Sequence, residues 1–170
     1  VEFHEGINVM IGHNNSGKSN LLRAMQLVLE PHCRTRKLRS SDFSRNINIA
    51  LLKRQAPKVE ISITLAKSVE DEQQDDLPMV ATWLTKMDEN YEAQLTYIFD
   101  LQDSKKDEYI DAVKDAGDHN EIWEIIEKKF IRYYVYSLWA GDMSHPVKPE
   151  GENLDKFDFQ YLGALRNVED

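Results

Sequence analysis

The stretch that decides the fold of this chain reads Gly12-His13-Asn14-Asn15-Ser16-Gly17-Lys18-Ser19. It matches the pattern G-x-x-x-x-G-K-[ST] of a phosphate-binding loop, or P-loop. In such a loop, backbone N–H groups converge on phosphate oxygens, and the positive end of the following helix strengthens the attraction. Gly12 and Gly17 permit backbone conformations that a Cβ atom would obstruct.

Two side chains of this loop carry the expected chemistry. The motif places the ammonium of Lys18, our candidate catalytic group, near the β- and γ-phosphates, and it places the hydroxyl of Ser19 to coordinate Mg²⁺. The sequence therefore predicts that the chain binds ATP with Mg²⁺. The complete set of candidate nucleotide-binding residues is Gly12, His13, Asn14, Asn15, Ser16, Gly17, Lys18, Ser19 and Asn20.

The segments on either side of the loop have the pattern that a P-loop needs. Residues 6–12 are short and apolar and predict a β-strand, and residues 18–30 have helical periodicity that Pro31 ends. The alternative is a glycine-rich turn before a helix. A simple turn of that kind would not explain why a lysine and a serine occur next to each other at this position.

A basic stretch follows the helix. Residues 32–58 contain eight Lys or Arg and one acid, a local charge of +7, so the other residues sum to −16. We expect a loop with a short helical turn. Its charge favours a polyanionic partner, with Arg34, Arg36 and Arg39 as candidate DNA contacts, although a solvated basic loop remains the alternative.

The remaining sequence, residues 59–170, predicts strands with inserted helices. Alternation indicates strands over 59–65, 95–101 and 157–161, and 132–138 is aromatic and β-prone. Helical spacing marks 69–88 and 106–130. Because alternating strands are typical of antiparallel sheets with one wet face, the predicted fold is α/β: a P-loop NTPase lobe whose sheet is largely antiparallel.

The loop and its neighbours resemble a known group of ATPases. Asn20 extends the motif to G-x-N-x-S-G-K-S-N, which is similar to the P-loop of ABC-type ATPases of the SMC and RecF kind. Within that group, the chain most resembles the OLD-family (overcoming lysogenization defect) ATP-dependent endonucleases. The supporting segments are Ser41-Asp42-Phe43, the strand-like Pro57–Ile63, and Tyr161-Leu162-Gly163-Ala164-Leu165-Arg166.

The resemblance implies a partial ABC-type ATPase domain over residues 1–170, with a P-loop strand and helix at 6–30 and a basic loop at 32–58. It implies a parent protein that forms a homodimer or higher homo-oligomer and controls DNA processing in repair or phage defence. The parent's nuclease domain would lie downstream, and the first strands would lie upstream. The resemblance also implies Gln160 as a second ligand of Mg²⁺.

An ATPase of this kind also needs an apolar strand that ends in Asp-Glu. The segment Leu95–Asp100 imitates one, but Leu101 follows, and the alternation indicates a half-exposed strand. Asp142 is likewise not followed by a glutamate. No LSGG-like signature appears in the sequence. We therefore expect this chain by itself to bind ATP and to hydrolyse it negligibly.

Composition and cysteine content limit the classes of protein to which this chain can belong. The chain has 170 residues, a net charge of −9 and one cysteine, Cys33, so an intrachain disulfide is excluded and a cytoplasmic location is expected. No apolar run is long enough to cross a membrane. Two other readings remain open: a small P-loop nucleotide or metabolite kinase, and a nucleotide-gated interaction module without catalysis.

Overall fold

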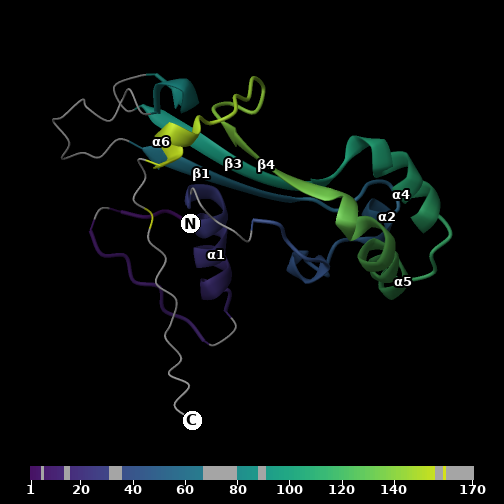
Figure 1. Cartoon of the computed structure of the whole chain (residues 1–170). Coiled ribbons are helices and arrows are strands. Elements are labelled where there is room, and N and C mark those ends of the chain that lie inside the picture. Colours follow the sequence, from purple (N-terminus) through teal and green to yellow (C-terminus); the bar gives the residue numbers. More distant parts are fainter. Residues whose placement is uncertain are drawn as a thin grey trace, which may run out of the picture.

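The computed structural model describes residues 1–4, 6–13, 16–30, 36–66, 80–87, 91–155 and 159 (Figure 1). Its four strands form one antiparallel sheet around the long strand β3 (Glu92–Leu101). Strand β1 (Val59–Ala66) pairs with one edge of β3, and Val59 lies opposite Phe99. Strands β2 (Leu84–Lys86) and β4 (Tyr134–Ala140) follow one another along the other edge.

One face of the sheet is buried in the hydrophobic core. Residues of β3 at every second position are almost completely buried: Leu95, Tyr97, Phe99 and Leu101. In β1, the alternating residues from Val59 to Leu65 are half-buried and those between them are exposed, as period-two burial requires. On the other face, the hydroxyls of Ser62 and Thr96 share a hydrogen bond of 2.9 Å.

Helix α1 (Lys18–Leu29) packs against β1 and β3 (Figure 1). It begins after Gly17, whose φ of 88° is left-handed. It ends at Glu30, which is extended, because the residue before a proline is sterically disfavoured from the helical conformation. The predicted helix over 18–30 is confirmed.

Several other helices gather at one end of the sheet, away from α1 (Figure 1). They are α2 (Ile49–Leu52), α4 (Lys106–Val113), and α5 (His119–Ile125), which continues as a π-helix (Ile126–Phe130). Asp118 caps α5 by accepting a 2.9 Å hydrogen bond from the N–H of Glu121. A short helix, α6 (Gly151–Asp155), follows β4. The helices predicted within 106–130 are confirmed, and the strand predicted over 132–138 is observed at 134–140.

The basic stretch is part of the core. Its described portion, residues 36–58, contains the short 3₁₀ helix Ser40–Asp42 and α2, as predicted. Phe43 is 3% exposed, and its ring lies 5.4 to 5.9 Å from the rings of Phe99, Trp123 and Tyr134. The hydroxyls of Tyr109 and Tyr134 donate to the carbonyls of Leu52 and Pro57. The picture of a wholly solvated loop is therefore wrong for this portion.

The predicted strand over residues 6–12 is not observed. Residues 6–12 form no strand, and Ile7, Val9 and Ile11 are 94%, 74% and 93% exposed. An apolar alternating segment becomes a β-strand only when a neighbour takes up its backbone hydrogen bonds. Among the described residues no strand pairs with it.

Two other sequence-based expectations also need correction. The helix expected over 69–88 is replaced at its described end by a 3₁₀ turn (Ala81–Trp83) and by β2, because pairing with β3 outweighs the helical spacing. Strand β3 is central in the sheet, because strands flank both of its edges, and its burial alternates between one buried face and one mostly half-buried face. The strand predicted over 157–161 lies outside the described residues, apart from Phe159.

Candidate nucleotide-binding site

The P-loop lysine is folded back over its own loop. The ammonium of Lys18 donates to the carbonyls of Gly12 at 2.6 Å and His13 at 2.8 Å, and to the hydroxyl of Ser16 at 3.2 Å. The N–H of Ser16 donates to the carbonyl of His13 at 3.2 Å, which closes a turn. These contacts bring the first and last parts of the motif together around one fixed cation.

Both motif glycines meet a steric requirement here. A Cβ atom on Gly12 would lie 2.7 Å from the hydroxyl oxygen of Ser16, closer than non-bonded atoms approach. Gly17 has a φ of +88°, which side-chain-bearing residues rarely adopt, and its carbonyl accepts the N–H of Leu21 at 3.0 Å to start α1. The sequence pattern therefore specifies the loop-to-helix junction.

Ser19 and Asn20 lie exposed in the first turn of α1. The Ser19 hydroxyl is a hard oxygen ligand of the kind that Mg²⁺ prefers, and Mg²⁺ commonly keeps several waters and phosphate oxygens as its other ligands. Within the described residues, no cluster of three or more His, Cys, Asp or Glu could hold a metal ion. The exposed Ser19 hydroxyl therefore fits as one ligand of a Mg²⁺ ion that is held jointly with a phosphate.

Four of the predicted site residues cannot be placed. Asn14, Asn15, Arg34 and Gln160 lie outside the described residues. Their assigned roles in binding nucleotide, DNA and Mg²⁺ remain predictions.

The two acids that imitate a catalytic carboxylate are engaged locally. Asp100, near the end of β3, forms an ion pair with Lys106 at 3.0 Å. The pKa of Lys106 is raised mainly by its hydrogen bond with Asp103 and, to a smaller extent, by its hydrogen bond with Asp100. Asp142 accepts the N–H of Ser144 at 2.7 Å, which lowers the pKa of the Asp142 carboxyl. Both side chains have turn and capping partners, as expected of structural acids.

The structure separates the two described arginines of the DNA prediction. Arg36 is half-buried, and its guanidinium donates to the carbonyl of Glu30 at the end of α1. Arg39 is exposed, and its backbone N–H donates to Asp42 at 2.7 Å. Arg39 is therefore accessible to a polyanion, whereas Arg36 is occupied within the fold.

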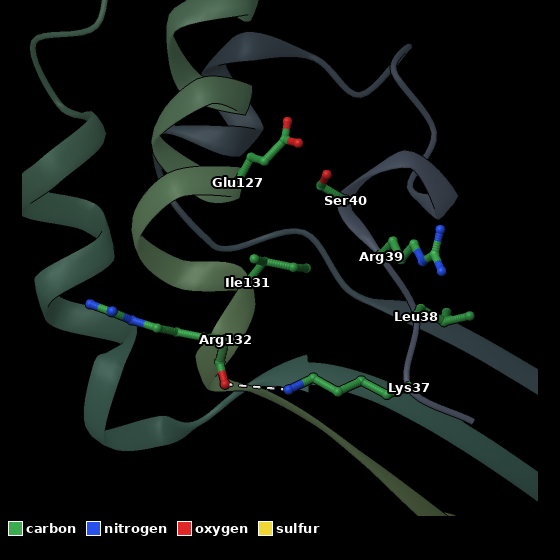
Figure 2. Close-up of a pocket in the computed structure, with 7 residues that line it drawn as sticks. All are labelled: Lys37, Leu38, Arg39, Ser40, Glu127, Ile131 and Arg132. Carbon is green, nitrogen blue, oxygen red and sulfur yellow. Dashed lines mark hydrogen bonds between the residues drawn. The ribbon is translucent and has the colours of Figure 1, made fainter. Parts of the chain in front are cut away.

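An open groove of about 500 Å³ runs between the stretch Lys37–Ser40 and the end of the π-helix (Figure 2). Figure 2 shows the carboxylate of Glu127 and the hydroxyl of Ser40 directed into the gap, whereas the guanidinium groups of Arg39 and Arg132 point in different directions. Lys37 donates to the carbonyl of Arg132 at 3.4 Å. Among the described residues, none from the P-loop lines this groove, so the groove lies apart from the described part of the candidate nucleotide site.

Sequence reasoning missed one group of contacts around α1. The hydroxyl of Tyr97 donates to the carbonyl of Arg36, and Arg36 in turn contacts the end of α1. Tyr97 appears in the sequence only as one apolar position of an alternating strand. Nothing in the local pattern indicates a partner 61 residues away.

Comparison with protein families supports the interpretation of the loop. The model of the AAA ATPase domain family matches residues 1–137, most of the chain, and this supports ATP binding. Comparison with curated proteins and with solved structures finds no match. Among the described residues, none of the helices has the length and apolar composition needed to span a bilayer.

Proposed function

We propose, for a chain that belongs to the AAA ATPase domain family, that residues 12–20 bind ATP with Mg²⁺ and that ATP occupancy controls an action on DNA. The observation that carries the nucleotide part is the position of the Lys18 ammonium, bonded to the carbonyls of Gly12 and His13 at the N-terminus of α1. A fixed cation beside a helix N-terminus suits a polyphosphate. The DNA part is supported by the resemblance to the SMC, RecF and OLD proteins and by the basic stretch.

Each P-loop residue has a distinct part in this proposal. Lys18 binds the β- and γ-phosphates, and Gly12 and Gly17 let the backbone approach them. Ser19 gives one oxygen ligand to the metal. When bound, Mg²⁺ neutralises phosphate charge.

We expect Ser19→Ala to weaken ATP binding much more with Mg²⁺ than in EDTA. The reason is that the hydroxyl acts through the metal, and without metal it has no charged partner at the phosphates. The measurement is a titration with a fluorescent ATP analogue in both buffers. An equal loss in both buffers would show instead that Ser19 has only a structural role at the start of α1.

The charge distribution predicts weak and salt-sensitive DNA binding. The basic stretch attracts phosphates, while the rest of the chain, at −16, repels them. The logarithm of the affinity should fall steeply with the logarithm of salt concentration, because bound phosphates release counterions. Double charge reversal, Arg34→Glu with Arg39→Glu, should lower that slope by about two, roughly one for each lost phosphate contact.

This prediction is checked by the anisotropy of a labelled duplex over a series of KCl concentrations. Lys114→Glu is the control, because Lys114 is exposed at the end of α4 and, among the described residues, its ammonium pairs with Asp111 at 3.4 Å. Arg36 is left unchanged because it contacts Glu30. Salt-resistant binding, or an equal effect of Lys114→Glu, would contradict the assignment of the basic stretch.

The kinase alternative requires a mostly parallel sheet. All strand pairs in the described residues are antiparallel, which favours the ABC-type lobe over a kinase. Incubation with ATP and a panel of nucleoside monophosphates separates the two functions, and we expect no phosphoryl transfer. A nucleotide-gated interaction module without catalysis would also transfer no phosphoryl group. In that case, however, DNA would not change the affinity of the chain for nucleotide.

A further inference from the structure

Helix α1 is attached to the rest of the fold mainly by its C-terminal half. Leu27, Val28 and Leu29 are 2%, 0% and 9% exposed, and they are the fully buried residues of the helix. The first turn, which carries the P-loop, is half-buried to exposed. The orientation of the helix is therefore set at the end opposite the nucleotide site (Figure 1).

Two hydrogen bonds fix that buried end. The guanidinium of Arg36 donates to the carbonyl of Glu30, one of the carbonyls that a helix C-terminus leaves without an intrahelical partner. The carbonyl of Arg36 accepts the hydroxyl of Tyr97, a fully buried residue of β3. We call this arrangement of Glu30, Arg36 and Tyr97 the α1 clamp.

The ring of Tyr97 makes a rigid anchor for the clamp. It stacks on Tyr136 of β4 with ring centroids 6.1 Å apart and planes inclined by 12°. Tyr97 is opposite Ile61 of β1 and Leu138 of β4, so strands hold it on both sides. The clamp thus joins the P-loop helix to the centre of the sheet.

We propose that Arg36 and Tyr97 are positioning residues for nucleotide binding, which they support by fixing the tilt of α1. This inference rests on the proposed binding of ATP at the P-loop. A 12-residue helix is about 18 Å long, so a tilt of about 5° at the clamp displaces the P-loop by about 1.5 Å. Such a displacement is enough to misalign backbone N–H donors and phosphate oxygens, because hydrogen bonds weaken steeply with poor geometry.

The test is ATP affinity in Tyr97→Phe against Tyr109→Phe. Each substitution removes one hydroxyl from a fully buried tyrosine that donates to a backbone carbonyl. The hydroxyl of Tyr109 contacts Leu52 in the helical end of the molecule, away from α1. The two substitutions should therefore lower the free energy of unfolding by similar amounts. Only Tyr97→Phe removes a hydrogen bond of the α1 clamp.

We expect Tyr97→Phe to weaken binding of a fluorescent ATP analogue about three- to tenfold, the factor that corresponds to the net contribution of one hydrogen bond. Tyr109→Phe should leave the affinity unchanged. Arg36→Met, which keeps an apolar stem, should weaken binding similarly, and Arg36→Lys should restore part of it through a remaining donor. Thermal unfolding of each variant shows that it is folded, and Arg36→Met serves if Tyr97→Phe does not fold.

The outcomes separate this inference from the proposed function. Equal affinity in Tyr97→Phe and the unmodified chain, or an equal loss in Tyr97→Phe and Tyr109→Phe, would overturn the positioning role while ATP binding still stands. No measurable ATP binding by the unmodified chain would overturn both. Loss in Tyr97→Phe and Arg36→Met with retention in Tyr109→Phe supports the clamp.

Discussion

Replacing Lys18 by alanine is expected to weaken ATP binding by about 10- to 100-fold. Hydrogen bonds to charged groups contribute about 1.5 to 3 kcal/mol each, and Lys18 is the cation that the motif directs at the β- and γ-phosphates. The variant also removes the bonds from the ammonium to the carbonyls of Gly12 and His13. Phosphate affinity and the closure of the loop are therefore lost together.

The measurement is a titration with a fluorescent ATP analogue, alongside Lys114→Ala as a control. Lys114 lies on the surface and pairs with Asp111 at 3.4 Å, so its removal changes the net charge equally without touching the loop. Thermal unfolding confirms that both variants are folded. Unchanged affinity in folded Lys18→Ala would mean that residues 12–19 do not bind phosphate.

Replacing Phe43 by alanine is expected to lower the free energy of unfolding by about 3 to 5 kcal/mol, the usual cost of truncating a buried phenylalanine. The side chain is 3% exposed and contacts three aromatic rings from β3, α5 and β4. Its removal opens a cavity among side chains from several elements, which cannot all move to fill it.

Urea unfolding followed by tryptophan fluorescence measures this loss, because Trp123 is one of the contacting rings. Leu51→Ala is the control in the same basic stretch. Leu51 is 45% exposed, so a change within about 0.5 kcal/mol is expected. A small effect of Phe43→Ala would show that the basic stretch is a loose surface loop after all.

Local signals in the amino-acid sequence suffice to predict the P-loop and the helix that follows it. Gly12, Gly17 and Lys18 act through local geometry: a missing Cβ, a left-handed φ and a side chain that reaches back six residues. Pro31 sets the end of α1 through the residue before it. The sequence also predicts β1 and β3 from alternating apolar residues and β4 from its aromatic, β-prone residues, but it does not predict their order in the sheet.

Which strand is central, and where the basic stretch packs, depend on contacts between distant parts of the chain. The alternation in β3 says which of its residues share a face, but not that the strand is central, which follows from the pairing of β1 and β4 along its two edges. Conversely, residues 6–12 have the composition of a strand, yet Ile7 and Ile11 remain exposed without a pairing partner among the described residues. Burial depends on partners distant in sequence, which a local pattern does not contain.

The same reason explains the clamp on α1. Arg36 looks like one more cation of a basic loop, and Tyr97 looks like one more apolar residue of a strand. Their contact joins residues 61 positions apart and exists only because α1 packs against β3. The chemistry of each side chain follows from the residue type, whereas the packing of α1 on the sheet determines which side chains act together.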